Sequence, residues 1–181
     1  MATINVKDFK VIYTDNFFFD TNVWLLLFGT IAEYELRSQR LYSKFLESLI
    51  STNNFIYINS TIASEFANVI LRRDFNLWVS NNKLVNQDFK RDFVGSATYQ
   101  DSVNSISILL NKILKLPNVQ RISDSFHNVH IENILTNFKI VDFNDSYIYA
   151  ISLANNYKIV TNDKDFQKLH GSIVIITTQI A

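Results

Sequence analysis

Short runs of apolar residues recur along the chain and predict the strands of a β-sheet. The candidate strands lie at residues 17–19, 55–58, 139–141, 158–161 and 173–176. Each is a continuous apolar run, whereas a half-buried strand alternates apolar and polar residues. Continuous runs are typical of parallel strands that are covered by helices on both faces of the sheet.

Segments with helical periodicity separate these strands. Apolar residues recur at helical spacing over residues 23–27, 31–50, 62–70 and 145–155, with a short helical turn near 166–169. Ser60 or Thr61 is the expected N-cap of the helix at 62–70. Helices that alternate with strands predict an α/β domain with a mainly parallel sheet.

The middle of the chain shows no strand pattern. From about residue 74 to 137 the periodicity stays helical but more polar, with a break at about 78–87 and an end at Pro117. A further short helix is expected at 125–138. We therefore interpret residues 74–137 as a helical insertion within a single domain that spans all 181 residues.

Composition narrows the class of protein. Hydrophobic residues make up 48% of the chain and charged residues 19%, which excludes a disordered protein. The absence of cysteine excludes disulfide frameworks, thiolate zinc sites and cysteine nucleophiles. Seventeen Lys and Arg balance seventeen Asp and Glu, so nucleic-acid binding would need a local basic patch. With no signal-peptide pattern and no apolar run long enough to span a membrane, we expect a cytoplasmic protein.

Four carboxylates fall where the pattern places strand ends and helix starts. Asp20 and Asp163 each follow a predicted strand, and functional groups collect at that edge of a parallel sheet, although either residue also suits a turn or an N-cap. Glu65 lies on the apolar stripe of its helix, where a carboxylate needs a cation, a metal or a raised pKa, unless it sits at the rim. Asp145 opens the next helix, where an acidic residue also suits the helix dipole.

Together these carboxylates would repel one another unless a divalent cation lay between them. Oxygen-only ligands suit Mg²⁺ or Mn²⁺ better than Zn²⁺. Metal ions held by clustered carboxylates are a recurring solution for phosphodiester hydrolysis. The histidines, at 127, 130 and 170, do not lie at metal-pair spacing with these acidic motifs, and we expect His127 and His130 on an exposed helix face.

Four segments, in this order, resemble the motifs of the PIN domain family. They are Phe19-Asp20-Thr21-Asn22-Val23-Trp24, Ser64-Glu65-Phe66, Asn144-Asp145-Ser146-Tyr147-Ile148 and Val160-Thr161-Asn162-Asp163-Lys164-Asp165-Phe166. The resemblance covers about residues 17–65 and 138–178. It implies a three-layer α/β/α sandwich and a Mg²⁺- or Mn²⁺-dependent ribonuclease of the type seen in VapC-like toxins and in RNA-processing factors.

The resemblance also implies roles for individual positions. The catalytic and metal-binding acidic quartet that it implies is Asp20, Glu65, Asp145 and Asp163. The supporting positions are Thr21, Asn22 and Thr161, together with Asp165, an acidic position that some members use. Asp142 matches no family position, and we interpret it as a turn residue. The middle segment is longer than a compact VapC-like toxin needs, which bears on the toxin assignment and not on the fold.

Basic and aromatic residues are interleaved between positions 72 and 93. The candidate RNA-binding cations are Arg72, Arg73, Lys90 and Arg91, and the neighbouring rings are Phe75, Trp78, Phe89 and Phe93. Such mixtures bind single-stranded nucleic acid. Alternatively, the rings form a local core with the cations at its rim, or the same stripe accepts an antitoxin peptide or the second subunit of a homodimer.

The leading hypothesis is a metal-dependent endoribonuclease that hydrolyses phosphodiester bonds of single-stranded or structured RNA. It would act as the toxin of a toxin–antitoxin pair or as an RNA-processing factor. The alternative is a catalytically weak PIN-like scaffold that binds RNA or a protein partner, which the zero net charge favours. A structure-specific DNA nuclease is a third hypothesis, but it would need a duplex-binding basic helix, and we find no strong one.

Overall fold

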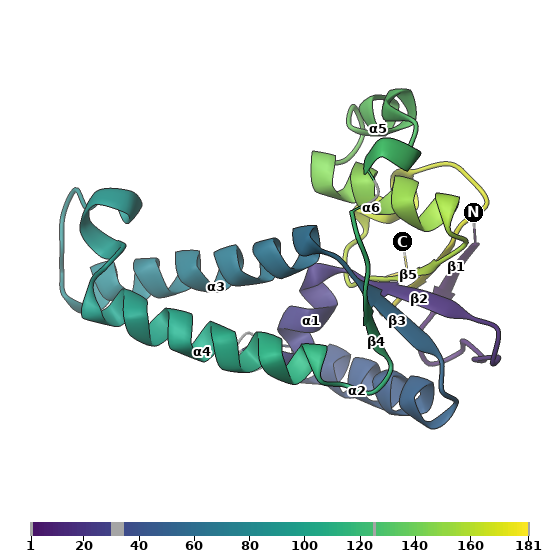
Figure 1. Ribbon diagram of the computed structural model, residues 1–181, viewed down its shortest axis with the longest axis horizontal. Helices are drawn as coiled ribbons and strands as arrows, with labels where there is room; N and C mark the ends of the chain where they lie inside the picture. The colour runs from purple at the N-terminus through teal and green to yellow at the C-terminus, as the bar shows by residue number, and fades with distance from the viewer. Residues whose placement is uncertain (1, 30–34, 125, 181) are drawn as a thin grey trace.

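Parallel strands form one β-sheet in the computed structural model, which describes residues 2–29, 35–124 and 126–180 (Figure 1). The strands are β1 (Ala2–Asn5), β2 (Asn16–Phe19), β3 (Phe55–Ile58), β4 (Val119–Arg121), β5 (Lys158–Val160) and β6 (Val174–Thr177). Their order across the sheet is β1-β6-β5-β2-β3-β4, and every neighbouring pair is parallel. The predicted α/β class with a parallel sheet is therefore confirmed.

Helices cover both faces of the sheet and make a three-layer α/β/α arrangement (Figure 1). They are α1 (Thr21–Phe28), α2 (Leu36–Ser51), α3 (Ser60–Asn81), α4 (Ala97–Leu114), α5 (Ile131–Asn137) and α6 (Phe143–Ala154). Shorter helical turns among the described residues are η2 (Phe89–Phe93), η3 (Phe126–Asn128) and η4 (Asp165–Lys168). The start of the helix predicted at 31–50 lies outside the described residues, as does Ser125. Within the described ranges, no helix has the length and apolar character to cross a membrane.

The central strand, β2, is the most deeply buried part of the sheet. Phe17, Phe18 and Phe19 have no exposed surface, and the neighbouring strands contribute Ile56 and Ile159, which are also fully buried. Both faces of β2 are apolar, as expected for a strand that helices cover on both sides. Burial of each such side chain adds roughly 1.5–3 kcal/mol to the free energy of unfolding. The residues that follow β2 are therefore held on a rigid base.

Three sequence predictions about elements are wrong. The run at 139–141 is a turn between α5 and α6, in which the backbone amides of Ile140 and Val141 donate to the carbonyl of Asn137. The stretch 74–137 is not free of strands, because it contains β4, an edge strand on which Gln120 and Arg121 are exposed. The N-cap of α3 is Asn59, whose Oδ1 accepts from the amide of Ile62, and not Ser60 or Thr61.

Helices α3 and α4 pack side by side and extend away from the sheet as an arm (Figure 1). The first half of α3 belongs to the core, with Ile62, Phe66 and Ile70 buried. At the far end of the arm, the rings of Phe75, Trp78, Phe89, Phe93 and Tyr99 pack on one another. These rings therefore form the local core that the sequence left as an alternative to a nucleic-acid surface. That residues 74–137 are an insertion in the family fold stays a prediction.

Candidate metal centre

The predicted acidic residues come from segments that meet at one edge of the sheet. Strands β3, β2 and β5 are adjacent and parallel, so their carboxyl ends share that edge. Asp20 directly follows β2, Asp163 follows β5, and Glu65 lies in the second turn of α3, which follows β3. Asp145 comes from the first turn of α6.

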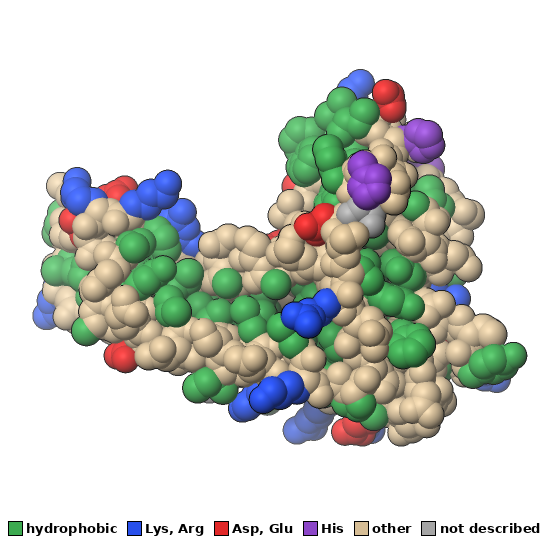
Figure 2. All heavy atoms as spheres, viewed as in Figure 1, with side chains coloured by type: hydrophobic (Ala, Val, Ile, Leu, Met, Phe, Trp, Pro, Cys, Tyr) green, Lys and Arg blue, Asp and Glu red, His purple; other side chains and the backbone are tan. Residues whose placement is uncertain are grey.

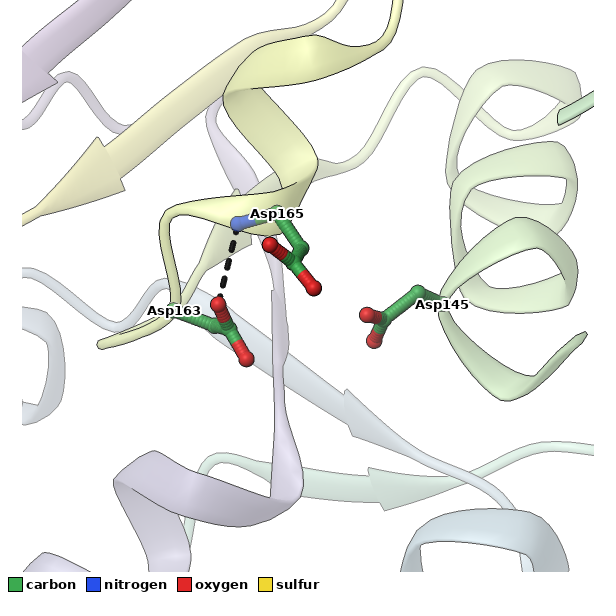
Figure 3. A group of neighbouring side chains, drawn as sticks. All are labelled: Asp145, Asp163 and Asp165. Atoms are coloured by element: carbon green, nitrogen blue, oxygen red, sulfur yellow. Dashed lines mark hydrogen bonds between the residues drawn. The ribbon is translucent and has the colours of Figure 1, made fainter. Parts of the chain in front are cut away.

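Asp145, Asp163 and Asp165 form the tightest carboxylate group among the described residues. One carboxylate oxygen from each lies within 4.8 Å of the other two, and Figure 3 shows the three side chains directed toward a common space. The backbone N–H of Asp165 donates to Oδ1 of Asp163 at 2.9 Å, which holds the loop in place. Asp165 also forms an ion pair with Lys168 at 2.6 Å, so part of its charge is already balanced.

Asp20 is buried, with 5% of its surface exposed, and its carboxylate accepts three hydrogen bonds. Oδ1 accepts from the backbone N–H of Thr21 at 2.6 Å, which makes Asp20 the N-cap of α1. Oδ2 accepts from the side chains of Asn22 at 2.6 Å and Thr161 at 2.7 Å. The Thr161 hydroxyl in turn accepts from the backbone N–H of Asp163 at 2.9 Å. One buried hydroxyl thus links Asp20 to the loop that carries Asp163.

Glu65 is connected to the same centre through α1. The Thr21 hydroxyl donates to Oε2 of Glu65 at 3.0 Å, while Thr21 itself follows Asp20. Burial raises the pKa of Glu65, and the charge of Asp142 raises it further. Asp142, interpreted from the sequence as a turn residue, is the N-cap of α6, accepting from the amide of Asp145 at 2.8 Å.

Burial and mutual repulsion raise the pKa of Asp20 and that of Asp145. The pKa of Asp20 rises to about 7, mainly through burial, with Glu65 and Asp163 adding repulsion. The pKa of Asp145 rises to about 8, again mainly through burial, with added repulsion from Asp20, Asp142, Asp163 and Glu65. Asp20 and Asp145 therefore each lie within electrostatic reach of the other predicted acidic residues.

No Lys or Arg forms an ion pair with Asp20, Glu65, Asp145 or Asp163 in the parts of the chain that the structure describes. Buried, uncompensated carboxylates are costly, and a cation between them would remove that cost. The available donors are carboxylate and hydroxyl oxygens, which Mg²⁺ and Mn²⁺ prefer. The centre therefore fits a hard divalent cation by its chemistry. Asp165 belongs to the close trio, whereas Asp20 and Glu65 join it through hydrogen bonds and charge.

Two further residues that the sequence reasoning missed hold the loop after β5. The Tyr42 hydroxyl, on α2, donates to the carbonyl of Thr161 at 2.6 Å and accepts from the amide of Thr178 at 3.1 Å. The Asn162 amide N–H donates to Oδ1 of Asn22 at 2.8 Å. Tyr42 lies on the apolar stripe of its helix, so its sequence position carries no signal beyond a core role.

A cleft of about 710 Å³ runs along α3 from its first turn, past Glu65, to Arg72 on the arm. Its lining residues are Ser60, Thr61, Ser64, Glu65, Asn68, Val69, Arg72 and Asn144. Thr61, Glu65, Asn68 and Arg72 share one helical face because they are spaced three or four residues apart. Arg72 lies about 10 Å along the helix axis from Glu65, and its guanidinium sits 4.2 Å from the centre of the Phe89 ring. From the sequence, this spacing could have predicted that these polar residues line one face of the helix next to Glu65.

The other candidate RNA-binding cations differ from Arg72. Arg73 pairs with Asp74 at 2.7 Å, and Arg91 pairs with Asp92 at 2.6 Å. Lys90 is exposed in η2, at the far end of the arm. His127 and His130 are exposed as expected, but His127 lies in η3 and His130 is the N-cap of α5, so they do not share one helix.

The fold and the site together define an all-parallel α/β/α protein with a carboxylate centre at the carboxyl edge of its sheet. The PIN domain family matches residues 17–171, and the chain belongs to that family. PIN domains are generally nucleases and typically use a divalent metal ion. No curated protein matches the chain.

Two solved structures share this fold. One is VapBC2 from Rickettsia felis bound to a DNA fragment from their promoter, with 18% identity and a TM-score of 0.53; the match covers 88% of this chain and 97% of that one. The other is PAE2754 from Pyrobaculum aerophilum, with 13% identity and a TM-score of 0.50; the match covers 98% of this chain and 93% of that one. At this level of identity, the likeness concerns the fold alone.

Proposed function

We propose that the protein is a Mg²⁺- or Mn²⁺-dependent endoribonuclease that hydrolyses phosphodiester bonds of single-stranded or structured RNA. The observation that carries the proposal is the carboxylate trio of Asp145, Asp163 and Asp165, next to the buried Asp20, at the sheet edge. When bound, a divalent ion would lower the pKa of an attacking water and stabilise charge on the leaving oxygen. The residues proposed to hold it are Asp20, Glu65, Asp145 and Asp163, with Asp165 as a supporting carboxylate.

The supporting residues would keep these carboxylates in place before RNA binds. Thr161 holds Asp20 and the Asp163 loop at a fixed separation, and Asn22 ties the same loop to α1. Thr21 orients Glu65. Ligands on a rigid sheet edge need little rearrangement, and such preorganisation is what a metal-binding catalytic site requires.

RNA would approach along the cleft on α3, which leads away from Glu65. Ser64 and Asn68 offer hydrogen-bonding groups to sugars and phosphates, and Arg72 offers a phosphate contact at the far end. Lys90, at the far end of the arm, would add a further cation. A local patch of this kind allows a chain of zero net charge to bind RNA.

The biological setting that we propose is a toxin–antitoxin pair, with an antitoxin protein as the partner and a homodimer as a further assembly. The support is the fold shared with VapBC2. An RNA-processing role would use the same site and cleft. Co-expression with a small protein encoded in the neighbouring reading frame would distinguish them, since an antitoxin should suppress both toxicity and cleavage.

The test of the nuclease is cleavage of a labelled single-stranded RNA in Mg²⁺ or Mn²⁺. Asp20→Asn and Asp163→Asn should each lower the rate by roughly a hundredfold or more, and the double variant should lose little beyond either single change. Residues that act as one catalytic unit are non-additive in this way. Asp101→Asn, at an exposed position on α4, is the matched control and should cleave normally.

Two results would reject this function. Cleavage that persists in EDTA would exclude a metal-dependent reaction. Cleavage that the double variant retains would remove Asp20 and Asp163 from the site and leave an RNA-binding or protein-binding scaffold as the better description.

A further inference from the structure

Four aromatic side chains form a continuous series on the α5 and α6 side of the cleft. Tyr147 contacts Phe126 at 5.9 Å and Phe143 at 6.4 Å between ring centroids, and Phe143 contacts Phe138 at 5.7 Å. Tyr147 is buried, whereas Phe126, Phe143 and Phe138 are exposed by 55%, 39% and 50%. The aromatic series therefore presents three rings to solvent on one buried anchor.

The aromatic series borders the cleft that leaves the carboxylate centre. The Tyr147 hydroxyl donates to the backbone carbonyl of Asp124, and the Asp124 carboxylate accepts from the hydroxyls of Ser60 and Thr61 at 2.5 Å and 3.4 Å. Both of these hydroxyl residues line the cleft. At the other end of the series, Phe143 precedes Asn144, another lining residue.

Figure 2 shows hydrophobic side chains on the side of the α5 and α6 lobe that faces the arm, across a hollow from the arm's basic end. The cleft thus has an aromatic border on one side and a polar stripe ending in Arg72 on the other. Ile131, Leu135 and Ile140 on the same lobe are also exposed, by 37%, 50% and 46%, but the border of the cleft combines exposed rings with hydroxyls, amides and a cation. That combination suits unpaired nucleotides, whose bases stack on rings while their phosphates pair with cations.

We propose that the aromatic series is a stacking platform for unpaired bases of a single-stranded RNA that lies across the carboxylate centre. This inference rests on the proposed ribonuclease function and adds the surface that would hold the bases of the substrate. Stacking accepts every base, so the platform selects single strands and not a sequence. It works without the metal, because the rings contact bases and not phosphates.

The test is equilibrium binding of a fluorescently labelled single-stranded RNA to the full chain in EDTA, where cleavage cannot interfere. Phe126→Ala and Phe143→Ala should each weaken binding by roughly five- to 150-fold, which corresponds to the loss of one stacked base. Phe143→Trp should restore tight binding. The matched control is Phe55→Ala, which removes a ring of 46% exposure from the start of β3, at the opposite edge of the sheet.

An abasic oligonucleotide with the same number of phosphates has no bases to stack. It therefore distinguishes a loss of base stacking from any other cause of weaker RNA binding. Wild type and both alanine variants should bind it with equal affinity. The proposal is overturned if the alanine variants match Phe55→Ala on RNA, if they lose affinity equally for the abasic strand, or if wild type does not bind single strands. It is also overturned if Phe143→Ala splits a wild-type dimer in size-exclusion chromatography, which would make the series an interface between copies of the chain.

Circular dichroism should first establish that each variant folds, and Phe126→Ala carries the test if Phe143→Ala does not, since Phe126 is the most exposed ring. The binding and cleavage assays fail independently. Ring-dependent binding without cleavage would reject the nuclease and keep the platform, whereas cleavage with ring-independent binding would reject the platform and keep the nuclease.

Discussion

Asp20 and Asp145 have an ordinary pKa of 3.8, yet in the fold the pKa of Asp20 rises to about 7 and that of Asp145 to about 8, mainly because both are buried. A carboxyl group whose pKa is raised by folding stabilises the protein while it is protonated. That contribution is full below the unfolded pKa and is lost as the pH rises through the folded pKa. The metal-free protein should therefore melt at a lower temperature at pH 9 than at pH 6.

Thermal denaturation in EDTA across this range tests the prediction, and Asp145→Asn should flatten the part of the profile near pH 8. Mn²⁺ at millimolar concentration should raise the melting temperature of wild type at pH 8 but much less that of Asp145→Asn, because a ligand bound to the folded state stabilises it. A metal-free profile that is flat or rises toward pH 9 would contradict the assigned burial of these carboxylates.

The order of strands and acidic residues predicted that carboxylates would lie at this edge of the sheet, but not which of them lie closest together or how each is held. Asp20 and Asp163 could be predicted because both follow buried strands of one parallel sheet. The ion pair of Asp165 with Lys168 could not, since it depends on the path of the η4 turn. The hydroxyl bridge through Thr161 likewise depends on a distance between residues 141 positions apart.

At the scale of elements, α2 supports the carboxylate centre from a distance. The Tyr42 side chain has no exposed surface, and its hydroxyl connects the carbonyl of Thr161 with the amide of Thr178. Tyr42→Phe keeps the ring but leaves the partly buried Thr178 amide and the Thr161 carbonyl without this partner. We expect a loss of roughly 1–3 kcal/mol in the free energy of unfolding and a higher metal concentration for half-maximal cleavage, because the Asp163 loop loosens.

Urea denaturation and a Mg²⁺ titration of cleavage measure the two effects. Tyr13→Phe, at a side chain that is 85% exposed, is the control and should change neither. A normal Mg²⁺ requirement in Tyr42→Phe, despite lower stability, would show that α2 only adds to the core.

Some strands could be predicted from the sequence and others could not. β2, β3, β5 and β6 were predicted because each contains a run of large apolar residues, most of which are buried. β1 and β4 were missed because both are edge strands, with partly or largely exposed residues that carry no apolar run. Residues 139–141 have strand-like composition, but only Val141 is buried, and the short link between α5 and α6 uses them as a turn.

At the scale of the whole molecule, the net charge is zero, but α3 separates the anionic carboxylate centre from a cationic side chain on the arm. The carboxylate centre lies at the base of α3, and Arg72 lies two helical turns along the same face. Arg73 and Arg91 already pair with neighbouring aspartates, so their contribution to phosphate binding is reduced. Arg72 therefore has a larger expected effect on RNA affinity than either of these arginines.

Arg72→Ala should weaken binding of single-stranded RNA and lower the slope of log affinity against log salt by about one, because one fewer phosphate is neutralised. Arg40→Ala, at an exposed position on α2, removes the same single positive charge as Arg72→Ala but should leave both the affinity and the slope near their wild-type values. Filter binding or fluorescence anisotropy over a range of salt concentrations, in EDTA, measures the slope. Equal slopes for the two variants would mean that RNA does not follow the cleft along α3, because a phosphate contact at Arg72 changes the slope wherever else the strand is bound.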